Sequence, residues 1–244
     1  MPVTDAEILE AQADFFAIAA FPRVIGAIDA AEIFQDTVRQ VLVGIAGVIN
    51  VSDDILVFGK SQEEHDVALE SVLERLKQSG LTLNERKCAF MKTSIHFLGF
   101  IFSDKGIAPD PKKVEAINNL DPPKNPSEVR SLLGMFNYVG KFIPNLASKT
   151  QPFRNLITKD CKWNWTTKHQ NIFDGLKKQL SEAPNLVYYD ATKVIHLYVD
   201  AGPQGLGAIL IQEKNGVTET VAYGSRSLTA TEGRYSQIEK EMLA

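Results

Sequence analysis

The fold of this chain is decided by one stretch, Gly47–Gly59, which reads GVINVSDDILVFG. Apolar residues lead into the pair Asp53-Asp54 and out of it again, so the stretch predicts two strands joined by a tight turn. Two adjacent carboxylates between buried strands repel each other and cost desolvation energy unless a cation offsets their charge. Magnesium prefers such oxygen ligands and often accompanies a phosphate substrate, so the pair is a candidate metal site. Asp-Asp is also a common turn sequence, which leaves a purely structural turn as the alternative.

The composition indicates an ordinary globular protein. The chain has 244 residues, 44% of them hydrophobic, which suits one to two domains. Its two cysteines, Cys88 and Cys161, have no partner at zinc-binding spacing and argue against a disulfide framework. No signal peptide and no long uninterrupted apolar stretch is evident, so secretion and membrane spanning are disfavoured. We therefore expect an intracellular protein, cytoplasmic or nuclear, with no membrane partner.

The net charge of -4 hides an asymmetry along the chain. Residues 105–170 hold 11 Lys and Arg against 5 Asp and Glu, a balance of +6, so the remainder carries -10. A basic central segment fits contact with a phosphate backbone. A solvated basic face is the alternative that the charge count leaves open.

Hydrophobic periodicity, capping signals and turn residues divide the chain into elements. Helices are expected at residues 31–46, from Ser61 to Gly80, after Asp110, after Asn125, between Trp163 and Pro184, and from Ser236 onward. Two short strands are expected within 81–102, and three longer ones at 194–199, 206–212 and 218–223. The pairs Ser61 with Glu64, Asn125 with Glu128, and Ser236 with Glu239 are helix-capping signals. Asn215-Gly216 predicts a hairpin between the last two strands.

A series of motifs runs through the chain from about residue 31. They are SDDILVF (52–58), EEH (63–65), LTLN (81–84) with Lys87-Cys88, FLGF (97–100), GIAPDPKKV (106–114), LLGMFNY (132–138) with FIPN (142–145), WNW (163–165), VDA (199–201), GLGA (205–208), SRSL (225–228) and YSQIEKE (235–241). In this order and spacing they resemble the reverse transcriptase and ribonuclease H-like region of Gypsy-class long-terminal-repeat retrotransposons.

The resemblance implies an α+β fold made of a partial polymerase palm with a helical thumb, followed by an incomplete ribonuclease H-like α/β domain. The expected boundaries are a foreign N-terminal stub at 1–30, the C-terminal part of the palm at 31–105, the thumb and connection at 106–185, and a truncated ribonuclease H-like domain at 186–244.

The resemblance also assigns candidate site residues in the palm. Asp53 and Asp54 match two of the three carboxylates that bind Mg²⁺ or Mn²⁺ in this family, where the third lies upstream in a stretch that this chain lacks together with the fingers. Lys87 matches a lysine placed at the leaving pyrophosphate, with an ordinary surface lysine as the alternative. The segment Phe97-Leu98-Gly99 matches the primer-grip hairpin, although simple core packing would also explain Phe97 and Leu98.

Two further groups of residues are assigned downstream of the palm. Asp200 and Glu241 match the first two carboxylates of the ribonuclease H-like metal site, whose remaining ligands would lie beyond Ala244. We expect the two carboxylates to approach each other, with Met242 and Leu243 packing the last helix onto the sheet. Lys112 and Lys113 lie in the basic segment and are candidate nucleic-acid contacts.

Residues 1–30 do not match the polymerase pattern. The stretch from about residue 5 to 29, and FFAIAAFPRVIGAID (15–29) in particular, resembles a Harbinger-type transposase nuclease, with Asp29 at the place of its first metal-binding carboxylate. This resemblance predicts a junction between two mobile elements near Ala30.

The expected function is that of a fragment of a retrotransposon polyprotein. The family performs RNA-directed DNA synthesis and cleaves RNA in RNA–DNA hybrids, so RNA, DNA, their hybrid, a primer-template and the remaining polyprotein segments are the implied partners. Because one palm carboxylate, the fingers and the later ribonuclease H carboxylates are missing, we expect this chain to be inactive alone. The alternatives are a non-catalytic nucleic-acid-binding module and a fragment of a DDE-type transposase.

Overall fold

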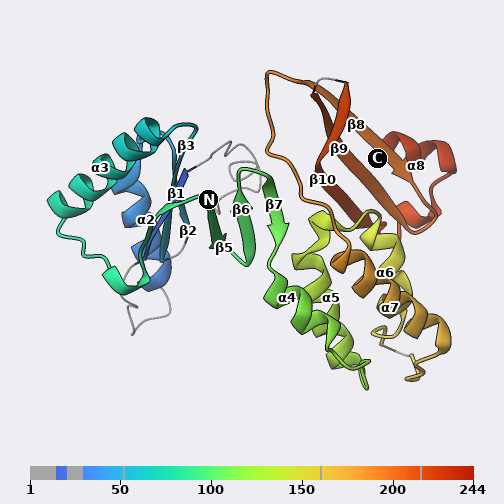
Figure 1. Ribbon diagram of the computed structural model, residues 1–244. Coiled ribbons are helices and arrows are strands. Elements are labelled where there is room, and N and C mark those ends of the chain that lie inside the picture. Colours follow the sequence, from blue (N-terminus) through green and yellow to red (C-terminus); the bar gives the residue numbers. More distant parts are fainter. Residues whose placement is uncertain (1–14, 21–29, 52, 160, 215) are drawn as a thin grey trace. The chain divides into compact units, whose positions relative to one another are not determined.

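The computed structural model describes residues 15–20, 30–51, 53–159, 161–214 and 216–244 (Figure 1). They form two compact units of mixed helix and sheet. The first unit extends to Ile107 and includes Tyr188–Asp190, and the second comprises Ala108–Val187 and Ala191–Ala244. Within the described residues, no helix combines the length and apolar character needed to cross a membrane.

A four-stranded antiparallel sheet forms the centre of the first unit, in the order β2-β3-β1-β4. Its strands are β1 (Phe15–Ala20), β2 (Val48–Val51), β3 (Asp54–Gly59) and β4 (Ala89–Lys92). The decisive stretch thus forms the predicted hairpin of β2 and β3. Strand β1 lies between β3 and β4, within a region that the sequence resemblance had assigned to a foreign stub.

Two helices, α2 (Ala30–Leu42) and α3 (Gln62–Gln78), pack against this sheet (Figure 1). The buried core cluster joins Val38 and Leu42 of α2, Ile55 and Val57 of β3, and Ala68, Val72 and Leu76 of α3. Ile55 and Val57 alternate along β3 and so present one face of the strand to both helices. Helix α2 ends four residues before its predicted end, because the chain turns at Gly44, whose φ is +83°.

Short strands and a turn of 3-10 helix follow, up to and across the end of the first unit at Ile107. The 3-10 turn is η1 (Glu85–Lys87), and the second sheet has the order β5-β6-β7, with β5 at Ser94–Phe97, β6 at Phe100–Ser103 and β7 at Gly106–Pro109. The prediction of two strands within 81–102 was therefore wrong in number, since β4, β5 and β6 all lie there or overlap its end.

Helices dominate the first half of the second unit. They are α4 (Pro111–Asn118), α5 (Pro126–Tyr138), α6 (Leu146–Asn155) and α7 (Thr167–Ser181), with the 3-10 turn η2 (Gly140–Phe142) between α5 and α6. Phe136, Phe153 and Phe173 are fully buried, and Trp165 stacks on Phe153 with 5.4 Å between the ring centroids. This aromatic core holds the helices together.

A three-stranded antiparallel sheet follows, in the order β10-β9-β8. Its strands are β8 (Val194–Ala201), β9 (Gly205–Lys214) and β10 (Val217–Ser227), and the chain continues through η3 (Glu232–Arg234) to α8 (Gln237–Leu243). The three strands and the final helix confirm the predicted element order. Gly216, at φ +77°, lies between β9 and β10 as the hairpin signal requires.

All three predicted helix caps are confirmed. The side chains of Ser61, Asn125 and Ser236 accept hydrogen bonds from the backbone N–H groups of Glu64, Glu128 and Glu239 respectively. Each of these glutamates in turn accepts a hydrogen bond from a backbone N–H group at the helix start. Such local signals fix where α3, α5 and α8 begin.

Helix α6 packs closely against the β10-β9-β8 sheet, where β9 carries small residues. The backbone N–H of Ala147 donates to Ser225 Oγ on β10 at 3.1 Å. A side chain at Gly207 would overlap Asn145 Oδ1, and one at Gly205 would come within 3.0 Å of Ser148 Oγ. These glycines therefore allow a close approach of α6 to the sheet in the second unit.

Candidate functional site

The carboxylate pair lies where β2 turns into β3. The strands pair from Val48 opposite Val57 to Val51 opposite Asp54, and Asp53 lies in the turn just before β3. Asn50 Nδ2 donates to the backbone carbonyl of Asp54 at 3.3 Å, which braces the turn. Asp53 and Asp54 are both partly buried, and the strand that follows them is anchored by fully buried apolar side chains.

The electrostatics of Asp54 indicate a carboxylate that lacks sufficient positive charge nearby. Burial raises the pKa of Asp54, the charge of Asp53 raises it further, and Lys87 opposes both effects. Lys87 lies at the end of η1, so the structure brings three of the predicted palm residues into electrostatic contact. A divalent cation at the pair would supply the missing positive charge.

In the part of the chain that the structure describes, the donor set for such an ion consists of the carboxylates of Asp53 and Asp54. Among the described residues, no three His, Cys, Asp or Glu side chains are grouped as they would be to hold a metal ion. On the neighbouring strand β1, Ala20 is paired with Asp54, so the adjacent strand offers no carboxylate at that level. Asp53 and Asp54 fit part of an oxygen-ligand cage for Mg²⁺ or Mn²⁺, not a complete one.

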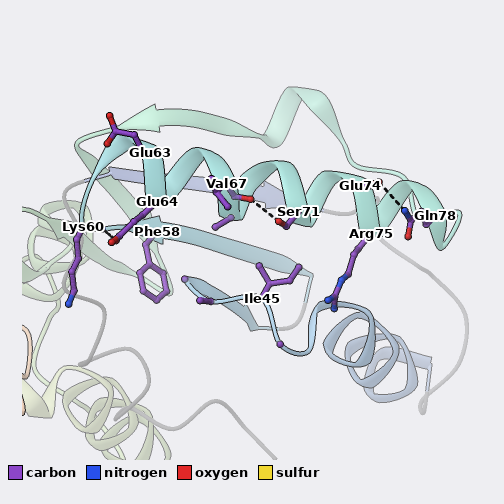
Figure 2. A pocket seen from close by; sticks show the side chains of 14 residues that line it. Ile45, Phe58, Lys60, Glu63, Glu64, Val67, Ser71, Glu74, Arg75 and Gln78 are labelled. Carbon is purple, nitrogen blue, oxygen red and sulfur yellow. Dashed lines mark hydrogen bonds between the residues drawn. The ribbon is translucent and has the colours of Figure 1, made fainter.

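A pocket of about 880 Å³ lies elsewhere in the first unit, along one side of α3 (Figure 2). Its polar groups bond largely within the protein: Arg75 donates to the carbonyls of Val41 and Val43, and Glu64 accepts from the backbone of Lys60. None of the predicted site residues lines it. We therefore place the candidate metal site at the turn between β2 and β3 and not in the pocket along α3.

The segment Phe97-Leu98-Gly99 forms the turn between β5 and β6. Leu98 and Gly99 have φ values of +48° and +68°, the left-handed pair that a tight hairpin turn requires. Phe97 is 2% exposed and packs edge-on against Phe102 with 6.1 Å between ring centroids. As placed, Phe97 is a core residue, and its side chain does not offer a surface to nucleic acid.

Lys112 and Lys113 lie exposed in the first turn of α4, as the basic segment suggested. The ammonium of Lys113 lies 4.3 Å from the ring centroid of Tyr138 on α5. This cation–π contact orients Lys113 without neutralising it, so both charges stay available to a phosphate backbone.

Asp200 and Glu241 lie in neighbouring elements of the second unit. Gln237 Nε2 donates both to the carbonyl of Ala201, next to Asp200 at the end of β8, at 2.7 Å and to Glu241 Oε1 at 2.6 Å. One amide thus bridges the end of β8 and the Glu241 carboxylate. Both acidic side chains are exposed. Gln237 was missed by sequence reasoning, although its place four residues before Glu241 on one helix face could have indicated the contact.

The expected packing of α8 through Met242 and Leu243 was wrong. Met242 is 85% exposed and Leu243 is also exposed, whereas Lys240 is buried and donates to the carbonyl of Gly233 at 3.1 Å. The hydrogen bonds of Gln237 and Lys240 therefore help to attach this short helix to the rest of the second unit.

A pH-dependent ion pair stabilises the segment that leads into α8. Arg226 donates two hydrogen bonds of 2.9 Å to Glu232, and together with the backbone N–H of Thr229 it lowers the pKa of Glu232 from 4.5 to about 2. Because the folded pKa is depressed, the stabilisation is present above pH 4.5 and is lost as the pH falls toward 2.

We therefore predict that Glu232→Gln lowers the free energy of unfolding most above pH 4.5. The difference from the unchanged chain should shrink progressively as the pH approaches about 2. Urea unfolding of both proteins at a series of pH values measures this difference. A difference that stays constant from pH 7 to pH 2.5 would contradict the ion-pair assignment.

Comparisons with known proteins agree with this arrangement. Residues 25–102 match the family described as reverse transcriptase (RNA-dependent DNA polymerase), and residues 165–244 match the RNase H-like domain found in reverse transcriptase. The fold, the carboxylate hairpin and these two matches define a fragment of a retrotransposon polyprotein that carries reverse transcriptase and RNase H-like domains.

The chain is also similar in sequence to individual transposon polyproteins. The chain is 35% identical over 198 residues to the Transposon Tf2-3 and Tf2-7 polyproteins of Schizosaccharomyces pombe (strain 972 / ATCC 24843). The matched region is 81% of this chain but 15% of each polyprotein. The chain thus spans a small part of the relatives it matches.

Solved structures show the same fold. The foamy viral protease-reverse transcriptase in complex with an RNA/DNA hybrid has a TM-score of 0.83 at 21% identity, covering 100% of this chain and 37% of that chain. The foamy viral protease-reverse transcriptase dRH in complex with double-stranded DNA has a TM-score of 0.82 at 21% identity, covering 100% of this chain and 48% of that one.

The comparisons do not support the Harbinger-type resemblance at the N-terminus. The reverse transcriptase match begins at residue 25, inside the stretch that had been assigned to a transposase. Strand β1 also pairs with β3 and β4. Asp29, the candidate transposase carboxylate, lies outside the described residues.

Proposed function

We propose that the chain supplies part of the duplex-binding and metal-binding surface of a retrotransposon reverse transcriptase. In this assignment residues 31–105 are the C-terminal part of the palm, 106–185 the thumb and connection, and 186–244 the beginning of the RNase H-like domain. The observation that carries the proposal is the position of Asp53 and Asp54 at a hairpin turn, with Lys87 acting on the partly buried Asp54 carboxyl.

Each site residue has a role in this proposal. Asp53 and Asp54 bind Mg²⁺ or Mn²⁺, which when bound supplies positive charge for the phosphoryl groups of a substrate. Lys87 neutralises the leaving pyrophosphate. The turn at Leu98-Gly99 approaches the primer strand through its backbone, because Phe97 is buried.

The second unit carries the other half of the proposal. Asp200 and Glu241 contribute two carboxylates to a metal site for cleavage of the RNA strand, and Gln237 positions Glu241 beside the end of β8. The RNA–DNA hybrid and the primer-template are the proposed nucleic-acid partners, and the solved relatives in complex with double-stranded DNA and with an RNA/DNA hybrid support this assignment. The remaining polyprotein segments complete both sites, so the chain alone is expected to be inactive.

Binding to an RNA–DNA hybrid tests the proposal. Replacing both Lys112 and Lys113 by glutamine should weaken binding of a labelled hybrid. The affinity of this variant should also depend less steeply on salt concentration. Each phosphate contact adds about 0.9 to the slope of log affinity against log salt. Fluorescence anisotropy between about 50 and 200 mM salt measures both effects.

A matched control carries the same change of charge outside the basic segment. Lys178 and Lys214 are exposed lysines of the second unit, and their double replacement by glutamine should leave the slope within error. Equal effects of the two double variants, or affinity for the hybrid that is independent of salt, would count against the proposed surface.

The second candidate function is a non-catalytic nucleic-acid-binding module. The balance of +6 over residues 105–170 favours it, because this charge does not depend on any carboxylate site. If the chain binds the hybrid but binds no metal ion at Asp53 and Asp54, the result favours this second candidate function.

A further inference from the structure

A second pocket of about 380 Å³ lies in the second unit between α6, α7 and the loop that joins β8 to β9. Two lysines, the half-buried Lys149 of α6 and the exposed Lys168 of α7, line it. The rest of its lining consists of the neutral polar residues Ser148, Gln179 and Gln204 and of Pro152, Ile172, Gly175 and Leu176. Its lining contains no acidic side chain. We call it the α6–α7 pocket.

The lysines of this pocket can donate more hydrogen bonds than they donate within the protein. Lys149 Nζ donates to Gln179 Oε1 at 2.8 Å, and an ammonium has three N–H donors. Lys149 is half-buried, and this burial lowers its pKa, as expected for a cation held without a nearby anion. Within the described parts of the chain, Lys168 has no ion-pair partner. An anion in the pocket would offset the desolvation of one lysine and pair with both.

The polar walls are held in place by the fold. Gln204 lies in the β8–β9 loop, and its carbonyl accepts from the backbone N–H of Leu228 at 3.1 Å. The Ser148 side chain packs against Gly205, where a side chain would crowd it. The α6–α7 pocket is therefore built from fixed elements, which favours a ligand of defined shape.

The position of the pocket indicates the source of the anion. Gln204 follows Ala201, the last residue of β8, by three positions, and the candidate carboxylate Asp200 comes just before Ala201. The β8–β9 loop thus joins the candidate carboxylate end of β8 to the pocket, and under the proposed function a nucleic-acid strand at Asp200 is the source of an anion there. The neutral and cationic lining suits a phosphodiester, which brings a negative charge and oxygen acceptors.

We propose that the α6–α7 pocket binds a backbone phosphate of the nucleic acid, with Lys149 and Lys168 as its cationic ligands and Ser148, Gln179 and Gln204 as neutral polar partners. This proposal rests on the proposed function, because the hybrid is the source of the phosphate. The site holds the strand in register with Asp200 and Glu241.

The double variant Lys149→Gln with Lys168→Gln tests the site in the full chain. Its affinity for a labelled RNA–DNA hybrid should fall on the order of tenfold at low salt, and its salt slope should decrease by about 0.9 per lost phosphate contact. The double variant Lys178→Gln with Lys214→Gln is the matched control, because it removes the same charge at two exposed lysines outside the pocket. Unchanged thermal unfolding of both variants shows that they fold.

Acylation of lysines, quantified by mass spectrometry, reports on the pocket directly. The hybrid should protect Lys149 and Lys168 but not Lys178, and inorganic phosphate in the millimolar range should protect the same two lysines more weakly. Together with weaker hybrid binding by the double variant, this pattern supports the proposal.

Three other outcomes each overturn it in a different way. Hybrid binding that depends on Lys112 and Lys113 but leaves Lys149 and Lys168 unprotected overturns the pocket while the proposed function stands. If inorganic phosphate protects the two lysines but the chain does not bind the hybrid, the pocket is a site for free phosphate. This outcome also overturns the proposed function. Absence of protection by both ligands overturns the phosphate site itself.

Discussion

Replacing Gly47 by alanine is expected to destabilise the first unit by about 3 kcal/mol, through two separate effects. Gly47 has φ +74°, a conformation that costs a residue with a side chain about 1 to 2 kcal/mol. The added Cβ would also overlap the backbone carbonyl oxygen of Phe58. The backbone N–H of Phe58 donates to the Gly47 carbonyl at 2.8 Å, so the two strands cannot separate there without losing a bond of the hairpin.

Gly44 provides the matched control for this prediction. It has φ +83° and open space where its Cβ would stand, so Gly44→Ala carries the conformational cost without the overlap. We expect it to cost about 1 kcal/mol. Urea unfolding gives the total loss, and amide hydrogen exchange in β2 and β3 shows whether the loss is located at the hairpin. Equal losses for the two variants would mean that the close approach at Gly47 has no energetic consequence.

The elements that the sequence predicted well are those defined by neighbouring residues. The cap at Ser61, the cap at Asn125 and the hairpin at Gly216 each depend on a few adjacent positions, so the pattern contains the whole signal. The core positions of α5 and its C-cap also follow from helical spacing: Val129, Leu132, Leu133 and Phe136 of the helix and the C-cap residue Val139 are all buried.

The missed elements depend on contacts that local patterns do not contain. Strand β1 is defined by pairing with β3 and β4, and its nearer partner begins more than thirty residues away. Helix α6 begins after Asn145 in a left-handed conformation and contains Pro152, two features that normally signal interruption. Its contact with Gly205 and Gly207 compensates through tertiary packing, which no helix pattern records.

The candidate site residues divide in the same way, into those that a local motif indicates and those that depend on tertiary contacts. Asp53, Asp54 and Lys87 are candidates because the motif resemblance assigns them residue by residue, and in the structure Asp53 and Lys87 both act on the charge of Asp54. Met242 and Leu243 were assigned to packing because they are apolar, but apolar character does not specify what covers a side chain. The α6–α7 pocket joins residues 148 to 204 from three elements, so no single stretch of sequence indicates it.

The carboxylate pair leads to the last prediction, which concerns metal binding. Because the described residues offer only Asp53 and Asp54 as carboxylates at this turn, we expect the chain to bind Mn²⁺ weakly there and to show no primer extension on an RNA template. Position 20 of β1 is paired with Asp54. The Cβ atoms of directly opposed residues in an antiparallel pair lie about 5 Å apart, close enough for two carboxylates to share one ion.

Ala20→Asp should therefore tighten Mn²⁺ binding on the order of tenfold, because adding a charged oxygen ligand raises affinity for a divalent ion. Electron paramagnetic resonance of free Mn²⁺ measures the affinity in each variant. The gain should vanish when Asp53→Asn and Asp54→Asn are combined with Ala20→Asp, whereas Ala20→Asn, of similar size but neutral, should give none. Primer extension should remain absent in every variant, because Ala20→Asp changes the metal site and not the surface that holds the incoming nucleotide. Tight Mn²⁺ binding by the unchanged chain, or extension abolished by Asp53→Asn, would show that a complete site already exists.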